Sequence, residues 1–143
     1  MERYRSLSIA VENFEKRFGI KFNERELLEV AINNRPRGSR KNESKGNPSN
    51  TRITRKTLST LGDAVLRLLS IESEQDRIIS VKYQRNSYLS RRFDLLVFQQ
   101  YLRIPCMSDE TKGNAIEAVL GAIYIDQGLD AARTFYGHSI MTS

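Results

Sequence analysis

The stretch "TRKTLSTLGDAVLRLLSI" (residues 54–71) contains a single acidic residue, Asp63, which directly follows Gly62. The whole chain has one cysteine, Cys106, and one histidine, His138. These two residues cannot form a disulfide, a structural zinc site or a Cys/His nucleophilic pair. Any metal bound by this chain therefore needs oxygen ligands, a preference typical of magnesium or manganese.

Helical periodicity places Asp63 on a polar face. At about 100° per residue, Asp63 lies nearly opposite the apolar stripe of its own segment, beside Lys56, Ser59 and Arg67. That stripe consists of Leu58, Leu61, Val65, Leu68 and Leu69. Asp63 therefore does not need to be buried in the core.

A second polar pair, Asn114 and Glu117, lies three residues apart on one flank of a later apolar segment. Gly62 and Gly121 would let two helices, or a ligand, approach closely. Taken alone, Asp63 and Glu117 are typical of ordinary surface or salt-bridged carboxylates.

The elements that must position these residues are all helices, because no alternating strand pattern is present. Asn23 and Glu26 have capping-box spacing, Asp109 is expected to cap a long helix, and Gly128 is expected to end it. The expected helices are one over Leu7–Phe18, one over 24–33, one around the Leu58–Leu69 stripe, a short one started by Ser73 or Asp76, and others over 80–90, 91–102, 109–127 and 129–136. Phe93, Leu96 and Val97 are expected on the buried side of the 91–102 helix.

Composition and charge indicate one compact domain. The chain has 143 residues, of which 39% are hydrophobic and 28% charged. No apolar run approaches the roughly 18 residues that a membrane span needs. Three glutamates among the first 19 residues argue against a signal or transit peptide. We therefore expect a cytoplasmic protein without a membrane partner.

The positive charge is concentrated in residues 34–56. The net charge of the chain is +6, and this segment has eight basic residues beside one acid, Glu43. Its Gly, Pro, Ser and Asn content predicts a flexible loop. A basic loop favours a polyanion such as RNA, although a merely solvated insertion is an equal alternative. The expected RNA-binding residues are Arg35, Arg37, Arg40, Lys41, Lys45, Arg52, Arg55 and Lys56.

Four segments resemble the catalytic domain of the ribonuclease III family, and the similarity runs from about Leu7 to Tyr136. "LSTLGDAVL" resembles the family's "LEFLGDAVL" signature, and "NAIEAVLGAIYIDQGLDAA" resembles its closing "DxxEALIGAIYLDGGLEAA". "FEKRFGIKFNERELLEVAINN" and "SVKYQRNSYLSRRFDLLVFQQYLRI" resemble its opening and middle helices. The resemblance implies a single all-α domain, residues 1–143, of about seven helices, and we expect no double-stranded-RNA-binding domain after it.

The resemblance also implies an active site. Family members cleave double-stranded RNA with a metal-activated water, and Mg²⁺ or Mn²⁺ neutralises the phosphodiester. Asp63 and Glu117 fall on two of the family's acidic positions and are the implied catalytic residues and metal ligands. Asn114 and Ser59 replace two further ligand carboxylates and would be weaker, neutral ligands. Lys56 replaces an outer acid, where it would repel a metal or bind phosphate in its place.

Two functions remain open. The first is a divalent-metal-dependent endoribonuclease that processes double-stranded or structured RNA with a reduced set of carboxylates. The second is a catalytically inactive ribonuclease III fold that serves as an RNA-binding or ribonucleoprotein component. The enzyme is favoured because both remaining acids occupy family positions on separate helices. The resemblance further implies a homodimer, with an interface around Leu58 and Leu61, and a possible RNA-binding partner protein.

Overall fold

The architecture is helical throughout the part that the computed structural model describes, residues 2–33, 53–73, 86–102 and 105–141. This part contains six α-helices and no strand, which confirms the all-α prediction. The helices are α1 (Glu2–Phe18), α2 (Arg25–Ile32), α4 (Arg55–Ser73), α5 (Asn86–Leu95), α6 (Asp109–Gln127) and α7 (Leu129–Phe135). A 3₁₀ turn (Phe98–Tyr101) follows α5, and a π-helical turn (Tyr136–Ile140) follows α7.

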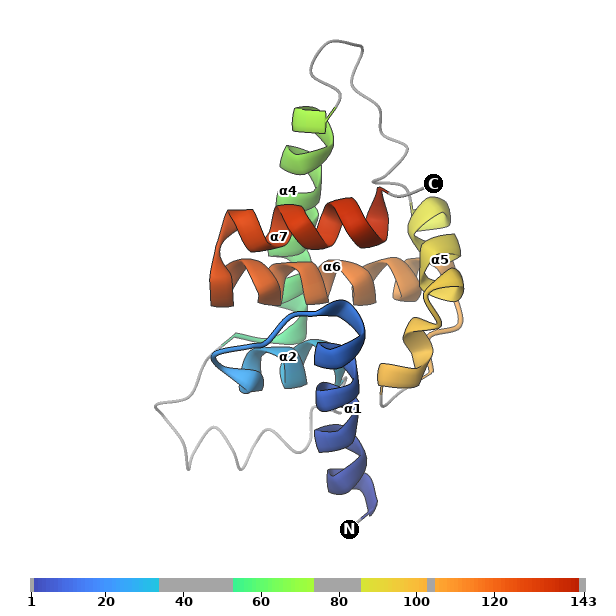
Figure 1. The fold of residues 1–143 in the computed structure, drawn as a ribbon. Coiled ribbons are helices and arrows are strands. Elements are labelled where there is room, and N and C mark those ends of the chain that lie inside the picture. Colours follow the sequence, from blue (N-terminus) through green and yellow to red (C-terminus); the bar gives the residue numbers. More distant parts are fainter. Residues whose placement is uncertain (1, 34–52, 74–85, 103–104, 142–143) are drawn as a thin grey trace.

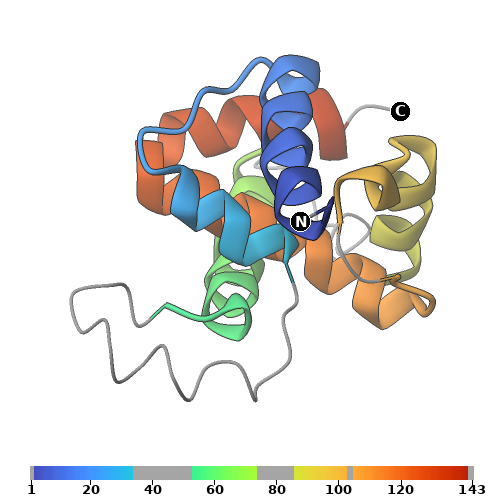
Figure 2. The ribbon, with the colours of Figure 1, turned by 90° about the horizontal axis from the view of Figure 1, so that it is seen from below.

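Helix α6 is the centre of the fold. Every residue from Ala115 to Ile123 is buried, because this segment is apolar or small on nearly all of its sides. In Figure 1, α7 and α2 lie on opposite sides of α6, and α4 crosses it. Figure 2 shows α1 between α2 and α5. The central helix therefore contacts most of the other helices, and a polar group in its Ala115–Ile123 segment is placed inside the domain.

Aromatic side chains hold α1 against the rest of the core. Phe14 is fully buried, and its ring lies 4.6 Å from that of Phe18 and 5.5 Å from that of Tyr101, between ring centroids. Phe98 and Phe135 complete the cluster, so α1, the 3₁₀ turn and α7 all contribute to it. Tilted and edge-on contacts of this kind stabilise a core beyond the burial of their area.

The turn between α1 and α2 corrects the capping-box prediction. Gly19 ends α1 with φ of +69°. The residue before α2 is Glu24, and its side chain makes no capping hydrogen bond. Instead, the backbone N–H groups of Asn23 and Glu24 donate to the Asp126 carboxylate on α6, at 2.8 and 2.9 Å. A distant carboxylate thus takes the role that the local pattern assigned to Asn23 and Glu26.

The N-cap of helix α6 lies one residue before the predicted one. Ser108, rather than Asp109, is the N-cap: its side chain accepts a hydrogen bond from the Thr111 N–H, and the Thr111 side chain accepts one from the Ser108 N–H. Asp109 lies in the first turn, where its charge complements the helix dipole. The predicted end of this helix at Gly128 is confirmed.

The prediction of one helix over residues 91–102 is wrong. Helix α5 runs from Asn86 to Leu95 across the expected break after Ser90, and the chain then turns at Val97, whose φ is +52°. Leu96 and Phe98 are both buried, although residues two apart on one helix point in nearly opposite directions. The turn resolves this conflict, and Val97 is left 55% exposed instead of buried.

The basic segment is described only at its end. Helix α4 begins at Arg55, because the Thr54 side chain accepts a hydrogen bond from the Thr57 N–H at 3.1 Å. Arg55 and Lys56 therefore belong to a helix and not to the predicted loop. The other predicted RNA-binding residues lie outside the described residues: Arg35, Arg37, Arg40, Lys41, Lys45 and Arg52.

Two further predictions concern a short helix after α4 and the dimer interface. Ser73 is the last residue of α4, and Asp76, the other expected start of a short helix, lies outside the described residues. The dimer interface was expected around Leu58 and Leu61. Leu58 is fully buried within this chain, so it is not available to such an interface. No helix among the described ranges is long and apolar enough to span a membrane.

Candidate active site

Two glycines allow α4 and α6 to touch at their backbones. A Cβ atom on Gly62 would lie 1.8 Å from the Glu117 carbonyl oxygen, and one on Gly121 would lie 2.2 Å from the Leu58 carbonyl oxygen. Any side chain at either position would force the helices apart. The sequence-based expectation of a close approach at these glycines is therefore confirmed.

This crossing brings Asp63 and Glu117 together. Asp63 follows Gly62 on α4, and Glu117 provides the carbonyl against which Gly62 packs. The Glu117 residue is 7% exposed, whereas the Asp63 side chain is 39% exposed. The two predicted catalytic residues thus form a pair with one buried and one accessible carboxyl group.

Glu117 is unusual because it is buried and one of its polar partners is another acid, Asp63. Burial, the charge of Asp63 and a hydrogen bond with Asp63 raise the pKa of Glu117 to about 8. At neutral pH its carboxyl group therefore holds a proton, which it can donate to the Asp63 carboxylate. A divalent cation bound by both groups would remove the repulsion and release this proton. The pair is chemically suited to such a cation.

The predicted auxiliary ligands lie one helical turn away from the pair. Ser59 precedes Asp63 by four residues on α4, is partly exposed, and its hydroxyl donates to the Lys56 carbonyl at 3.1 Å. Asn114 precedes Glu117 by three residues on α6 and is half-buried. Within the described ranges, no group of three or more His, Cys, Asp or Glu side chains is arranged to hold a metal. Among these described residues, the acidic part of the site is thus the pair alone.

Two basic residues flank Asp63 along α4. Arg67 forms an ion pair with it, with Nη2 3.3 Å from Oδ2. Lys56 is exposed and lies seven residues before Asp63, about 10 Å away along the helix axis. Because solvent screens an exposed ammonium group at this separation, Lys56 repels a cation at Asp63 only weakly.

Arg55, a predicted RNA-binding residue, is used inside the fold. Its Nε donates to the Ala31 carbonyl of α2 at 2.9 Å, and its side chain is partly covered. Burial lowers the pKa of Arg55 from its ordinary value. This guanidinium therefore joins α4 to α2.

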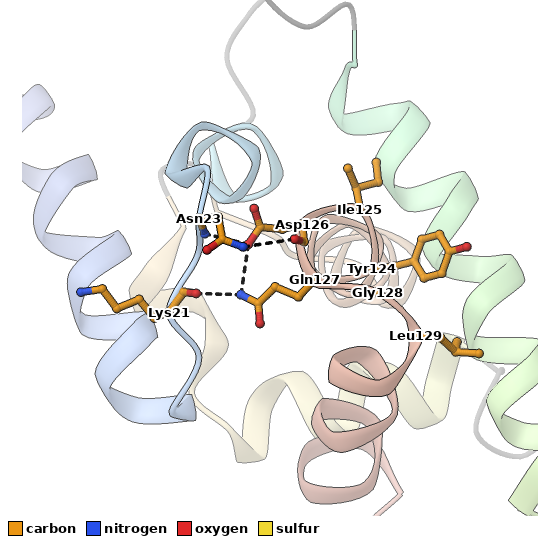
Figure 3. A pocket seen from close by; sticks show the side chains of 8 residues that line it. All are labelled: Lys21, Asn23, Tyr124, Ile125, Asp126, Gln127, Gly128 and Leu129. Carbon is orange, nitrogen blue, oxygen red and sulfur yellow. Dashed lines mark hydrogen bonds between the residues drawn. The ribbon is translucent and has the colours of Figure 1, made fainter.

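A cavity lies away from the acidic pair. Its volume is about 700 Å³, and it lies at the C-terminal end of α6, next to the turn between α1 and α2 (Figure 3). Its polar groups bind one another: Gln127 donates to the Lys21 carbonyl at 2.7 Å and to Asp126 at 3.0 Å. We interpret this cavity as the surface of a structural joint, because its carboxylate is already satisfied.

Sequence reasoning underestimated Glu117. As an isolated carboxylate it was expected on the surface, yet it is among the few buried charged residues. The sequence "AIEAVLGAI" indicates this burial, because all of its residues except Glu117 are apolar or small. A helix that is apolar on all sides is buried on all sides, and its one acid is buried with it.

The helical arrangement is that of a ribonuclease III nuclease domain. The chain superposes on two structures of the nuclease domain of ribonuclease III from Campylobacter jejuni, with TM-scores of 0.69 and 0.66 at 17% and 18% sequence identity. These matches cover 91% and 90% of this chain and 95% and 92% of the other chains. At this identity the likeness establishes the fold.

The sequence is also similar to the sequences of ribonuclease III proteins. It is 28% identical over 148 residues to Ribonuclease 3 of Pseudomonas syringae pv. syringae and 30% identical to that of Phenylobacterium zucineum, and each match covers 89% of this chain. The chain spans 58% of the length of these relatives. No family model matches the chain. In sequence the chain is similar to ribonuclease III proteins, and in fold it matches their nuclease domain.

Proposed function

We propose that this domain is a divalent-metal-dependent endoribonuclease of the ribonuclease III type, acting on double-stranded or structured RNA. The observation that carries the proposal is the Asp63–Glu117 pair, held together by backbone contact at Gly62 and Gly121. A buried acid facing a second acid costs stability unless a cation or a proton compensates it. Two glycines at the helix crossing and one buried glutamate form this arrangement, and they support a cation-binding role.

Mg²⁺ or Mn²⁺ would be held by Asp63 and Glu117, and when bound it would neutralise the phosphodiester and activate a water. Glu117 would give up its proton on binding and fix the inner side of the site. Asp63, which is accessible, would face the RNA. Ser59 and Asn114 would add neutral oxygens, which bind such cations less strongly than carboxylates do.

RNA binding would rest on the basic residues of the 34–56 segment, apart from Arg55. Contacts to phosphates give affinity that is independent of sequence and falls steeply with salt. Changing Arg37, Arg40 and Lys41 together to Gln should weaken duplex RNA binding and lower its salt dependence by up to about three phosphate contacts. An unchanged salt slope would contradict this role.

We also propose a homodimer, supported by the ribonuclease III nuclease domain of Campylobacter jejuni, in which a region is involved in dimer formation. Two sites would then face one duplex. A cytoplasmic location and an RNA-binding partner protein belong to the same proposal. Sedimentation of the purified chain, alone and with duplex RNA, would test the dimer.

The second candidate function is RNA binding without cleavage, in a ribonucleoprotein particle. It is favoured by the small acidic set, since within the described residues only two acids meet at the site. Lys56 near this site would then contact phosphate directly.

Cleavage of end-labelled long duplex RNA, first in Mg²⁺ and then in Mn²⁺, separates the two candidates. We expect discrete products from the wild type, and a loss of at least about 100-fold in Asp63→Asn. Glu12→Gln, an exposed acid on α1, is the matched control and should cleave normally. Intact RNA in both metals, together with a salt-sensitive gel shift, would instead establish the binding function.

A further inference from the structure

Arg67 forms an ion pair with the accessible member of the acidic pair, Asp63. It lies one turn after Asp63 on α4, and its Nη2 is 3.3 Å from the Asp63 Oδ2. Its side chain is 61% exposed. The Asp63 carboxylate therefore has a buried acid, Glu117, on one side and an exposed arginine on the other.

The ion pair is easily exchanged. Exposed pairs four residues apart on a helix contribute little to stability, because water screens them and both side chains lose freedom. The pair nevertheless neutralises the accessible carboxylate to which a cation would bind. A divalent cation at Asp63 must therefore displace Arg67 or share the carboxylate with it, and both lower its apparent affinity.

A displaced Arg67 would stay at the site. Its Cα is fixed about 6 Å along the helix axis from that of Asp63, so the freed guanidinium can reach a phosphate placed at the pair. Guanidinium groups bind phosphate through two parallel hydrogen bonds, which a lysine cannot reproduce. Lys56 lies on the same face of α4 at the other side of Asp63, so a strand crossing Asp63 would meet a cation on each side.

We infer that Arg67 is an exchangeable counter-ion: it neutralises Asp63 in the metal-free domain, yields Asp63 to the divalent cation, and then binds an RNA phosphate. This inference rests on the proposed function. It assigns Arg67 a positioning role at the site and predicts opposite effects of its removal on metal binding and on RNA binding.

The first experiment measures Mn²⁺ binding by titration calorimetry without RNA. We expect Arg67→Gln to tighten Mn²⁺ binding about two- to fivefold, the range of an exposed ion pair. Arg91→Gln, which removes an exposed arginine of α5, is the matched control and should leave the affinity unchanged. Equal affinities of wild type and Arg67→Gln would overturn the inference, as would an equal gain in Arg91→Gln.

The second experiment measures duplex RNA binding by gel shift on ice, over times at which the RNA stays intact. In Mn²⁺, Arg67→Gln should weaken binding about two- to fivefold and lower the salt slope by about one contact. In EDTA, Arg67 of the wild type remains paired with Asp63, so the wild type and the variant should bind RNA equally. Arg67→Lys should restore the charge but not the full affinity. The same loss in EDTA and in Mn²⁺ would overturn the inference.

Failure of the proposed function has a different result. If Asp63→Asn binds Mn²⁺ as tightly as the wild type, the acidic pair is not the cation site, and both proposals fall. If Asp63→Asn loses Mn²⁺ binding while Arg67→Gln matches the wild type, only the role of Arg67 is wrong.

Discussion

Two carboxylates on the central helix α6 show opposite local environments. Asp126, near its end, accepts hydrogen bonds from the N–H groups of Asn23 and Glu24 at 2.8 and 2.9 Å. Glu117, in its middle, is buried against Asp63, and the pKa of Glu117 is raised to about 8. The first carboxylate is satisfied by backbone donors, whereas the second faces another acid and is held in its protonated form. The difference separates a structural acid from one that is suited to a cation.

The largest expected effect comes from separating the helices that hold the pair. Gly62→Ala would place a Cβ 1.8 Å from the Glu117 carbonyl oxygen, and we expect it to lower the free energy of unfolding by about 4 kcal/mol or more. Thermal or urea denaturation measures this loss. Gly137→Ala, whose added Cβ would meet no atom within 4 Å, is the control and should be nearly neutral. Comparable stability of the two variants would contradict the backbone contact.

The second effect is the pH dependence of stability that Glu117 contributes. Because the pKa of Glu117 is higher in the folded domain than in the unfolded chain, the folded state holds an extra proton between about pH 4.5 and pH 8. Its stabilisation is complete below that window and is lost as the pH rises through it. Relative to Glu117→Gln, the wild type should lose about 3 kcal/mol of stability between pH 5 and pH 8. Urea denaturation of both proteins at each pH tests this. An equal change of the free energy of unfolding with pH in the two proteins would rule it out.

Asp126 should show the contrasting behaviour. Asp126→Asn leaves the backbone donors of Asn23 and Glu24 with a weaker acceptor, and we expect it to lower the free energy of unfolding by about 1 to 2 kcal/mol. RNA cleavage and Mn²⁺ binding should remain as in the wild type, since this acid lies in the structural joint. A loss of metal binding in this variant would remove the distinction between the two acids.

The sequence predicts the parts of the site that depend on periodicity and residue size. The end of α6 at Gly128 and the close approach at Gly62 and Gly121 follow from such patterns, and the structure confirms them. The stripe on α4 is confirmed only in part, because Leu68 is 44% exposed and Leu66 is fully buried in its place. The pairing of Asp63 with Glu117 was implied only by the family resemblance, because nothing local relates residues 54 positions apart.

Other features depend on tertiary contacts, and local patterns mispredicted them. The capping box at Asn23 is replaced by Asp126, which is 103 residues away in sequence. The turn at Val97 exists because Leu96 and Phe98 both face the core. Arg55 belonged to the basic segment by composition, yet its hydrogen bond to Ala31 joins α4 to α2. In each case a long-range partner outweighed the local preference.

The central claim is that Asp63 and Glu117 bind one divalent cation between them. Crystals of the domain soaked in Mn²⁺ and measured at a wavelength where manganese scatters anomalously would test it most directly. The account predicts one strong anomalous peak in contact with both carboxylates, absent from Asp63→Asn crystals treated in the same way. A crossing without such a peak, with Glu117 still protonated against Asp63, would contradict it.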